Sequence, residues 1–354
     1  FPALESKNFQ PTEHPPHVGG GPRGYKSFLM RRIVYGYKWK RNHRKKLGLP
    51  RKWWNVEQDR QLLTVDEWGI LWSSGGADRD LTMGHPFRGP FEDSWDDLEG
   101  HEFPDPTDET RYRFWRWPMK HLGWKKYILG MAGIAFIHNL TSWLRGFSNL
   151  MVDFVRNPKK VEELIEIVTD FFLVTVQKLK EKCPKMDAMM FFDDLGTQKS
   201  PFLSPTLFRR FFFDPYKKII DLTHDLDMDF ILHSCGQIKE LLPVLAELGV
   251  DVMEFDSPRM TGVENFKEYA NDRKMAFWLS SNIQSTYSHG TPDEIEEEVK
   301  YFVEEVGNNQ GGLAFYEYMD HDVLGVPKEN VKAFRRAMKK WGKYDANGIP
   351  TWLS

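Results

Sequence analysis

The sequence predicts an α/β protein, a (β/α)8 barrel of the TIM type with an N-terminal extension and cap insertions. Between residues 121 and 342, short apolar segments alternate with amphipathic segments, several of which begin at Asn-Pro, Ser-Pro or Thr-Pro pairs. Repeated strand–helix units of this kind build a parallel sheet. About seven such strands can be counted, which favours a closed barrel over an open sheet. We therefore expect one domain over residues 1–354, with irregular N-terminal and cap segments in 1–120 and the main repeats in 121–342.

The composition is that of an ordinary globular protein. Of 354 residues, 41% are hydrophobic and 28% are charged, and the formal net charge is −3. This near balance of charge does not predict a nucleic-acid surface. No apolar run approaches the roughly 18 residues of a membrane span, so no membrane association is expected. The two cysteines, Cys183 and Cys235, are far apart in the chain, which predicts reduced thiols and a cytoplasmic location.

Aromatic residues are abundant and form 14% of the chain, with 13 Trp among them. Many of them precede residue 150. They are expected either to fill a large Trp-rich core or to line a pocket for a flat, apolar substrate. The composition leaves both interpretations open.

The N-terminal third is predicted to be irregular, with a few short elements. Residues 1–24 are rich in Pro and Gly, with one short strand at 17–18, and a basic helix is expected over 25–47. The pattern of residues 66–72 predicts a strand that leads into a turn at 75–76, in a hairpin or cap. Ser94 is a good N-cap for a short helix, and Asp108 for the next one.

The strand–helix alternation begins after this region. The apolar runs predict strands over 127–131, 188–192, 230–233, 250–255, 275–279 and 313–315. The amphipathic pattern and the Pro and Gly punctuation predict helices over 136–144, 158–182, 205–212, 215–226, 237–248, 263–271, 292–306 and 327–341.

The strand at 230–233 ends in the motif His233-Ser234-Cys235-Gly236. Because His233 and Cys235 are two positions apart in extended chain, their side chains point to the same face. Imidazole and thiolate are ligands that zinc prefers. The C-terminal ends of the strands are also where an α/β barrel places its chemistry. The alternative is that both residues are ordinary core side chains.

Polar residues follow five consecutive predicted strands. If the barrel forms, all of them converge on one mouth, which is difficult to explain by helix capping alone. They are Asp193 and Asp194, His233 and Cys235, Glu254 and Asp256, Ser281 and Asn282, and Glu317 with His321.

A catalytic zinc site needs a third protein ligand and an open position. Glu254 and Glu317 are the best candidates for that ligand, and Asp256 comes after them. No second cysteine is expected at this edge. Zinc held by one His, one Cys and one carboxylate would act as a Lewis acid on an oxygen rather than as an activator of a thiolate.

From about His14 to Met338 the chain resembles the uroporphyrinogen decarboxylase superfamily of (β/α)8 barrels, and within it the corrinoid-dependent methyltransferase and O-demethylase branch. The segments that carry the resemblance are 143–147, 193–198, 203–205 with Phe208 and Pro215, 233–236, 249–251, 290–292, 311–312 and 326–330. These motifs are specific for the superfamily and not for one reaction within it.

The superfamily has two main chemistries. One is cofactor-free decarboxylation of uroporphyrinogen, whose signature, an Arg-Gln-Ala-Gly-Arg type run near the N-terminus, is not found here. The other is methyl transfer to or from a corrinoid. Methyltransferases of this superfamily that act on thiols carry His-x-Cys and a later Cys near the last strand, where this chain has Tyr316 and Glu317. That departure makes a thiol a less suitable substrate.

The resemblance therefore implies the methyltransferase of an anaerobic O-demethylase system. Such an enzyme moves a methyl group from a methoxylated aromatic to the cob(I)alamin of a corrinoid protein, and zinc helps the poor phenoxide leaving group to depart. It also implies a corrinoid protein as partner and, as a family property, a homodimer.

The roles that we expect fall into three groups. Catalysis is assigned to Asp193, Asp194 and His321, substrate binding to Trp143, Arg145, Gln198, Asn282 and Tyr316, and zinc binding to His233, Cys235, Glu254 and Glu317. The leading alternative is a metal-independent decarboxylase or lyase of the uroporphyrinogen decarboxylase type, with Asp193 or Asp194 as acid and base. A non-catalytic corrinoid or small-molecule carrier, and a methylamine or thioether as methyl donor, are further alternatives.

Overall fold

The computed structural model describes residues 56–58, 61–74, 85–112, 127–133, 135–272, 274–308, 312–318, 321–346 and 349–352. The strand expected at 17–18, the basic helix expected over 25–47 and the turn expected at 75–76 lie outside these residues. The described residues up to Met189 belong to one compact unit, and those from Met190 onward belong to a second. Each unit is considered by itself.

The first unit contains a small antiparallel sheet with strand order β1-β2-β3-β4. Its strands are β1 (Val56–Gln58), β2 (Gln61–Val65), β3 (Leu71–Ser74) and β4 (His85–Arg88). The prediction of a hairpin here is confirmed, but the prediction of a strand over 66–72 is wrong for residues 66–70. Those residues turn between β2 and β3, because the buried Asp66 carboxylate accepts hydrogen bonds from the backbone N–H groups of Trp68 (2.9 Å) and Ile70 (3.0 Å).

The remaining elements of the first unit follow the predicted order, except that helix α5 (Phe147–Arg156) was not predicted. Ser94 caps the 3-10 turn η4 (Trp95–Leu98) by accepting from the Asp96 N–H, and η5 (Glu109–Tyr112) begins after Asp108. Then come β5 (Leu129–Met131), α4 (Ile137–Arg145), α5 (Phe147–Arg156) and α6 (Pro158–Lys182). Helix α6 has the predicted bounds because Pro158 starts it and one apolar face is buried along its length.

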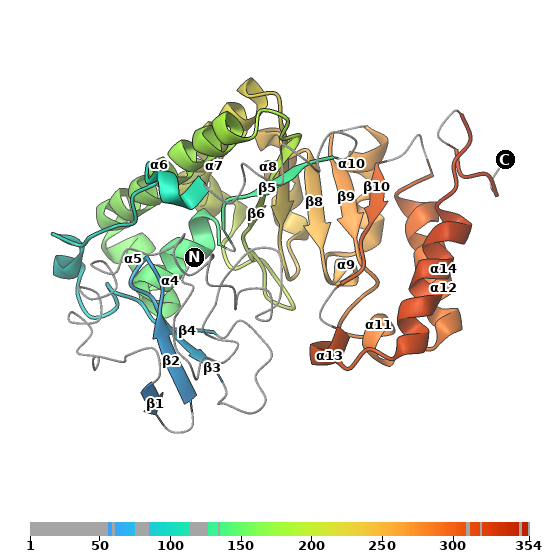
Figure 1. Ribbon diagram of the computed structural model, residues 1–354, viewed down its shortest axis with the longest axis horizontal. Helices are drawn as coiled ribbons and strands as arrows, with labels where there is room; N and C mark the ends of the chain where they lie inside the picture. Colours follow the sequence, from blue (N-terminus) through green and yellow to red (C-terminus); the bar gives the residue numbers. More distant parts are fainter. Residues whose placement is uncertain are drawn as a thin grey trace. The chain divides into compact units, whose positions relative to one another are not determined.

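The main sheet has the strand order β10-β9-β8-β7-β6-β5, and the boundary between the two units falls inside β6. Its later strands are β6 (Ala188–Phe192), β7 (Asp229–His233), β8 (Val252–Phe255), β9 (Ala276–Leu279) and β10 (Leu313–Phe315). Strands β7 to β10 pair in parallel, and Figure 1 shows β8, β9 and β10 side by side. The predicted α/β class is confirmed, while the sheet formed by the described residues stays open between β10 and β5.

Helices of the second unit follow the strands of the sheet. They are α7 (Pro205–Asp225), α8 (Leu242–Leu248), α9 (Pro258–Thr261), α10 (Lys267–Asn271), α11 (Thr286–His289), α12 (Pro292–Glu305), α13 (His321–Leu324) and α14 (Lys328–Trp341). The helices predicted over 237–248 and 263–271 are shorter than expected, because each begins with a 3-10 turn, η6 (Lys239–Leu241) or η7 (Val263–Asn265). None of the described helices is both long and apolar enough to cross a membrane.

The prediction of two helices separated before Pro215 is wrong. Helix α7 runs through Pro215 without ending. A proline inside a helix removes one backbone hydrogen bond and costs about 3 kcal/mol. Here the same helix face is buried on both sides of the proline, at Phe208, Phe212, Tyr216 and Ile219. That burial outweighs the local cost.

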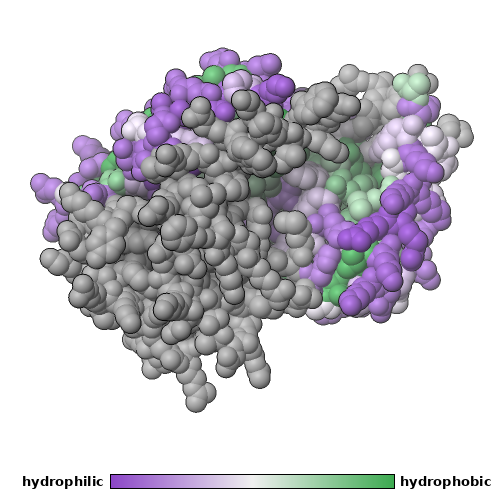
Figure 2. Space-filling model, in the orientation of Figure 1, coloured by the Kyte–Doolittle hydropathy of each residue, from purple (hydrophilic) through white to green (hydrophobic). Residues whose placement is uncertain are grey.

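Helices α12 and α14 pack against each other over an apolar cluster that includes Tyr287, Ile295, Val299 and Phe334. A capping box between Thr291 and Glu294 begins α12. Figure 2 shows hydrophilic residues over much of α12 and α14, as expected for helices that bury only one face.

A buried carboxylate joins α12 to the loops that follow β8 and β9. The side chain of Glu298 is fully buried and accepts four hydrogen bonds. The donors are Arg259 Nε (2.5 Å), Ser281 Oγ (2.5 Å), the Asn282 N–H (3.0 Å) and Thr286 Oγ1 (2.9 Å). Glu298 therefore sets the position of the segment that follows β9.

We predict that Glu298→Gln destabilises the protein by about 2–4 kcal/mol, because an amide cannot replace a buried carboxylate that accepts four hydrogen bonds. The measurement is the free energy of unfolding in urea. Glu297→Gln is the matched control, since Glu297 is the exposed neighbour on the same helix. Equal stability of the two variants would contradict the role assigned to Glu298.

Candidate metal site

The loops that follow β6 and β7 approach each other closely, and two glycines allow it. Gly236 has a φ of +90°, and a Cβ added there would lie 2.2 Å from the carbonyl oxygen of Gly196. A Cβ on Gly196 would in turn lie 2.6 Å from the Gln237 carbonyl oxygen. Only glycine fits such contacts. The close approach brings Asp194, after β6, next to Cys235, after β7.

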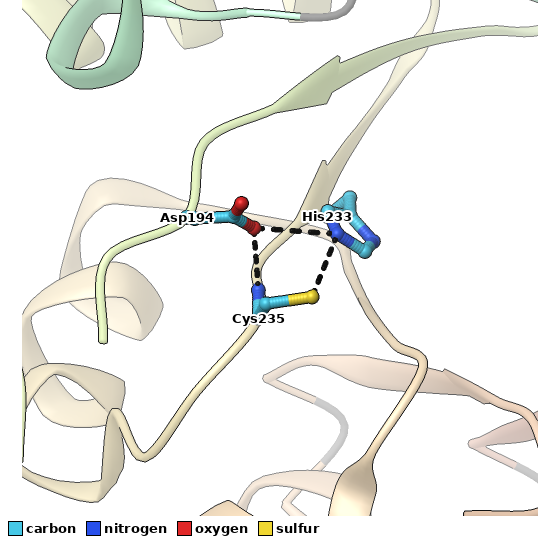
Figure 3. A group of neighbouring side chains, drawn as sticks. All are labelled: Asp194, His233 and Cys235. Atoms are coloured by element: carbon cyan, nitrogen blue, oxygen red, sulfur yellow. Dashed lines mark hydrogen bonds and ion pairs between the residues drawn. The ribbon is translucent and has the colours of Figure 1, made fainter. Parts of the chain in front are cut away.

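Three side chains meet at this point, as Figure 3 shows. Asp194 Oδ1 accepts a hydrogen bond of 2.9 Å from the Cys235 N–H and lies 3.5 Å from His233 Nε2. The Cys235 Sγ lies 3.4 Å from the same nitrogen. One ligand atom from each of the three residues lies within 4.8 Å of the others. The structure thus confirms that His233 and Cys235 share one face and adds Asp194 to them.

The second nitrogen of His233 is held by Glu254. Residues His233 and Glu254 are direct neighbours in the parallel pairing of β7 with β8. The Glu254 carboxylate is 4% exposed and bonds to His233 Nδ1. Because a carboxylate only accepts, Nδ1 carries a proton, and Nε2 faces Cys235 and Asp194. Phe192 packs against the imidazole at a centroid distance of 5.2 Å.

Burial and charge shift the pKa values of these groups. Burial lowers the pKa of His233, but the nearby Glu254, Cys235 and Asp194 raise it well above the ordinary value. Burial raises the pKa of the Cys235 thiol to about 11, although His233 acts in the opposite direction. Burial also raises the pKa of Asp194, yet the hydrogen bond and charge of His233 outweigh this and leave it lowered. The imidazole is therefore the positive centre of the cluster.

A second carboxylate and a phenol adjoin the thiol. Asp256 Oδ2 lies 4.0 Å from Cys235 Sγ, and the Tyr316 hydroxyl donates a hydrogen bond to Asp256 Oδ1. Trp278 packs edge-on against the Tyr316 ring at 5.5 Å between centroids. Burial raises the pKa of Asp256 to about 6, with the negative charge of Glu254 adding to the effect and the charge of His233 opposing it.

The spacing of these donors fits a metal ion. Around tetrahedral zinc, with a Zn–S bond of about 2.3 Å and Zn–N and Zn–O bonds of about 2.0 Å, neighbouring ligand atoms lie about 3.3–3.6 Å apart. The distances from His233 Nε2 to Cys235 Sγ and to Asp194 Oδ1 have these values. A carboxylate on the remote imidazole N–H is also the usual second partner of a zinc-bound histidine. We therefore treat Asp194, His233 and Cys235 as the candidate ligands.

Glu254 and Asp256 form a second group with His233 in which the ligand atoms are also within 4.8 Å. This group contains no sulfur, and Glu254 already occupies His233 Nδ1. The expected role of Glu254 as a ligand stays a prediction, and its carboxylate contacts His233 Nδ1 in this structure.

Glu317 and His321 do not join the cluster. The Glu317 carboxylate forms a two-point ion pair with Arg335 and lies 3.5 Å from His321 Nε2. His321 Nε2 is also 3.2 Å from the Tyr287 hydroxyl. Neither residue belongs to a candidate metal-binding group among the residues that the structure describes. The expectation that Glu317 is a zinc ligand and His321 a catalytic residue therefore gains no geometric support.

The other expected residues have different positions. Asp193 is completely buried, and the Tyr216 hydroxyl donates to its carboxylate. Asn282 Oδ1 accepts from the Gln284 N–H (3.2 Å), while Gln198 is exposed. The catalytic role expected for Asp193 and the substrate-binding roles expected for Asn282 and Gln198 stay predictions.

Trp143 and Arg145 lie in the first unit. Arg145 donates to Asp153 (2.6 Å) and to the Glu92 carbonyl oxygen (3.2 Å), and its guanidinium lies over the ring of Trp95. Trp143 packs edge-on against Trp72 at 5.2 Å. Both residues therefore make packing and polar contacts inside that unit.

Phe192 and Trp278 were not singled out from the sequence. Trp278 could have been found from its place in the sheet. In the parallel pairing, Glu254 of β8 lies between His233 of β7 and Trp278 of β9. Phe192 is the last residue of β6 and immediately precedes Asp193 and Asp194. Aromatic residues at strand ends could have been considered as site residues. They were not, because apolar side chains at such positions usually belong to the hydrophobic core.

Residues 99–341 match the protein family described as uroporphyrinogen decarboxylase (URO-D). The chain belongs to this family. The match includes every strand from β5 to β10, so it contains all the residues of the candidate site. The expected resemblance to the uroporphyrinogen decarboxylase superfamily is thereby confirmed over these residues.

Known proteins related to this URO-D family chain include a methylated-thiol–coenzyme M methyltransferase of Methanosarcina mazei. The two are 24% identical over 207 residues, which are 58% of this chain and 49% of the relative, so the match spans about half of the relative's length. A solved structure of a methyltransferase from Methanosarcina mazei matches with a TM-score of 0.53 and 20% identity, over 78% of this chain and 77% of that one. This second likeness supports the fold.

We predict that the purified protein binds about one zinc per chain and that Cys235→Ala loses most of it, because the thiolate is one of three ligands. The measurement is metal content by mass spectrometry after dialysis. Cys183→Ala is the control, since Cys183 is a buried cysteine at the end of α6. Equal zinc in both variants would contradict the site.

Proposed function

We propose that this protein is a methyltransferase that moves a methyl group from a methoxylated aromatic compound to the cobalt(I) corrinoid of a partner protein, with a zinc ion bound by Asp194, His233 and Cys235. The observation that carries the proposal is the cluster of these three residues at the C-terminal edge of the sheet. Membership in the URO-D family and the methyltransferase relative support the same class of reaction.

The ligand set favours an oxygen leaving group. It contains one thiol, one imidazole and one carboxylate, and the chain's other cysteine is buried at the end of α6. A zinc ion with a carboxylate ligand is harder and less electron-rich than one with two thiolates. When bound, zinc would act as a Lewis acid that stabilises the negative charge developing on the oxygen of the methyl donor.

The protein's own residues would orient this site. Glu254 fixes the tautomer and the ring of His233, so that Nε2 points to the ligand position. Asp194 accepts the Cys235 N–H and so holds the loop that carries the thiol. Zinc binding requires Cys235 as thiolate, which means that its proton leaves the site when the metal binds.

The aromatic side chains near the cluster support an aromatic donor. Phe192, Trp278 and Tyr316 are half-buried and come from β6, β9 and the end of β10. Phe192 packs on His233, and Trp278 packs on Tyr316. Flat rings of this kind form suitable walls for a methoxylated aromatic ring.

We predict that Glu254→Gln weakens zinc binding about 10–100-fold, since an amide is a poorer partner for the imidazole N–H than a buried carboxylate. Competition with a chromogenic chelator measures the affinity. Glu317→Gln is the matched control, because Glu317 is paired with Arg335 and should leave the affinity unchanged. The reverse order of effects would mean that Glu317 and not Glu254 supports the metal.

We predict that the zinc-loaded protein forms methylcobalamin from cob(I)alamin and a methoxybenzene derivative, that treatment with a chelator abolishes the reaction, and that added zinc restores it. The absorbance change of the corrinoid reports the transfer. The contrary result is a chelator-resistant release of carbon dioxide from a carboxylated substrate without any corrinoid. That outcome would favour a metal-independent lyase.

A further inference from the structure

Tyr316 is held next to the candidate zinc site by contacts from two neighbouring strands. Its backbone N–H donates to the Leu279 carbonyl oxygen (3.1 Å), which extends the pairing of β10 with β9 by one residue. Its ring packs edge-on against Trp278 of β9, and its hydroxyl donates to Asp256, which follows β8. The position of the hydroxyl is therefore determined by the sheet and not by a free loop.

Asp256 connects this phenol to the metal ligands. One of its oxygens accepts from Tyr316, and the other lies 4.0 Å from Cys235 Sγ. A single carboxylate thus separates the phenolic hydroxyl from the thiol. Tyr316 is therefore linked through Asp256 to the residues that would hold the metal.

The side chains around the phenol make it a suitable donor. The carboxylates of Asp194, Glu254 and Asp256 belong to the candidate ligand groups around His233, and those of Asp194 and Glu254 approach its nitrogens. Carboxylates accept hydrogen bonds when ionised and cannot donate to a developing oxyanion. Tyr316 carries a hydroxyl that donates and is half-buried, so water does not fully replace it.

We infer that Tyr316 is a catalytic residue that donates its hydroxyl proton to the leaving oxygen of the methyl donor, with Asp256 as the positioning residue that holds the hydroxyl in place until the proton is transferred. The inference rests on the proposed function and deepens it, since it assigns the site to donors whose methyl group is carried by an oxygen of low acidity, such as unactivated aryl methyl ethers.

The transfer balances in atoms and electrons. The bond between the methyl carbon and the ether oxygen breaks, and its electron pair stays on the oxygen. The new bond to the methyl carbon uses the electron pair of the cobalt(I) corrinoid acceptor. The hydrogen bond from Tyr316 to Asp256 breaks as the leaving oxygen takes the hydroxyl proton. The product leaves as a phenol, and solvent later returns a proton to the tyrosine.

The test is the dependence of methyl transfer on the acidity of the leaving phenol. A series of methoxybenzenes with electron-donating and electron-withdrawing substituents is assayed with cob(I)alamin and zinc-loaded protein. We expect Tyr316→Phe to lower kcat/KM about 100-fold for the least acidic phenols, the effect of removing a general acid. For nitro-substituted donors, whose phenols leave without a proton, we expect little change.

Tyr318→Phe is the matched control. Tyr318 is two residues further along and packs against the apolar cluster of α12 and α14. It should change neither kcat/KM nor its dependence on the leaving group. An equal loss for every donor with Tyr316→Phe, or no loss for any, would overturn the role of Tyr316 while the proposed function stands.

A second measurement does not require turnover. Calorimetry compares binding of a phenol and of its methyl ether to zinc-loaded protein. We expect Tyr316→Phe to weaken phenol binding about tenfold more than ether binding. The reason is that the Tyr316 hydroxyl forms a stronger hydrogen bond to the negatively charged oxygen of a bound phenol than to the neutral oxygen of an ether. Equal effects on both ligands would overturn the inference. Wild-type protein that binds zinc but transfers no methyl group from any donor would overturn the proposed function, and the inference with it.

Discussion

The contact between the imidazole of His233 and the buried carboxylate of Glu254 is the interaction on which the rest of the site depends. The parallel register of β7 and β8 places these two residues side by side. Since a carboxylate can only accept, it fixes the proton on Nδ1 and leaves Nε2 facing Cys235 and Asp194. Without this pair, the ring could rotate and the three ligand atoms would not share one centre.

The same edge of the sheet carries more acidic groups than basic ones. Glu254 is buried, Asp194 and Asp256 are partly exposed, and His233 forms ion pairs with Asp194 and Glu254. Buried negative charges are costly unless a positive charge lies close to them. The raised pKa of His233 is one response to this arrangement, and a bound divalent cation would be a stronger one.

A second buried carboxylate, Glu298, has a purely structural role and so differs from the acids around His233. It accepts four hydrogen bonds, one of them from Arg259, so its charge is satisfied by the protein itself. It ties α12 to the segments after β8 and β9 and so supports the region in which Asp256 and Asn282 lie. The acids around His233 differ from it, because Asp194 and Glu254 both approach the nitrogens of one imidazole.

The sequence by itself determined the α/β class and the extents of β6, β10 and α6, because these depend on apolar runs and helix caps. It also placed His233 and Cys235 on one face, because side chains two residues apart in a strand point the same way. Only the tertiary structure decided which carboxylate faces the imidazole. Asp194 reaches Cys235 because Gly196 and Gly236 let two loops touch, whereas Glu317 is drawn to Arg335 on α14. Such partners are distant in the chain, and packing rather than local propensity selects among them.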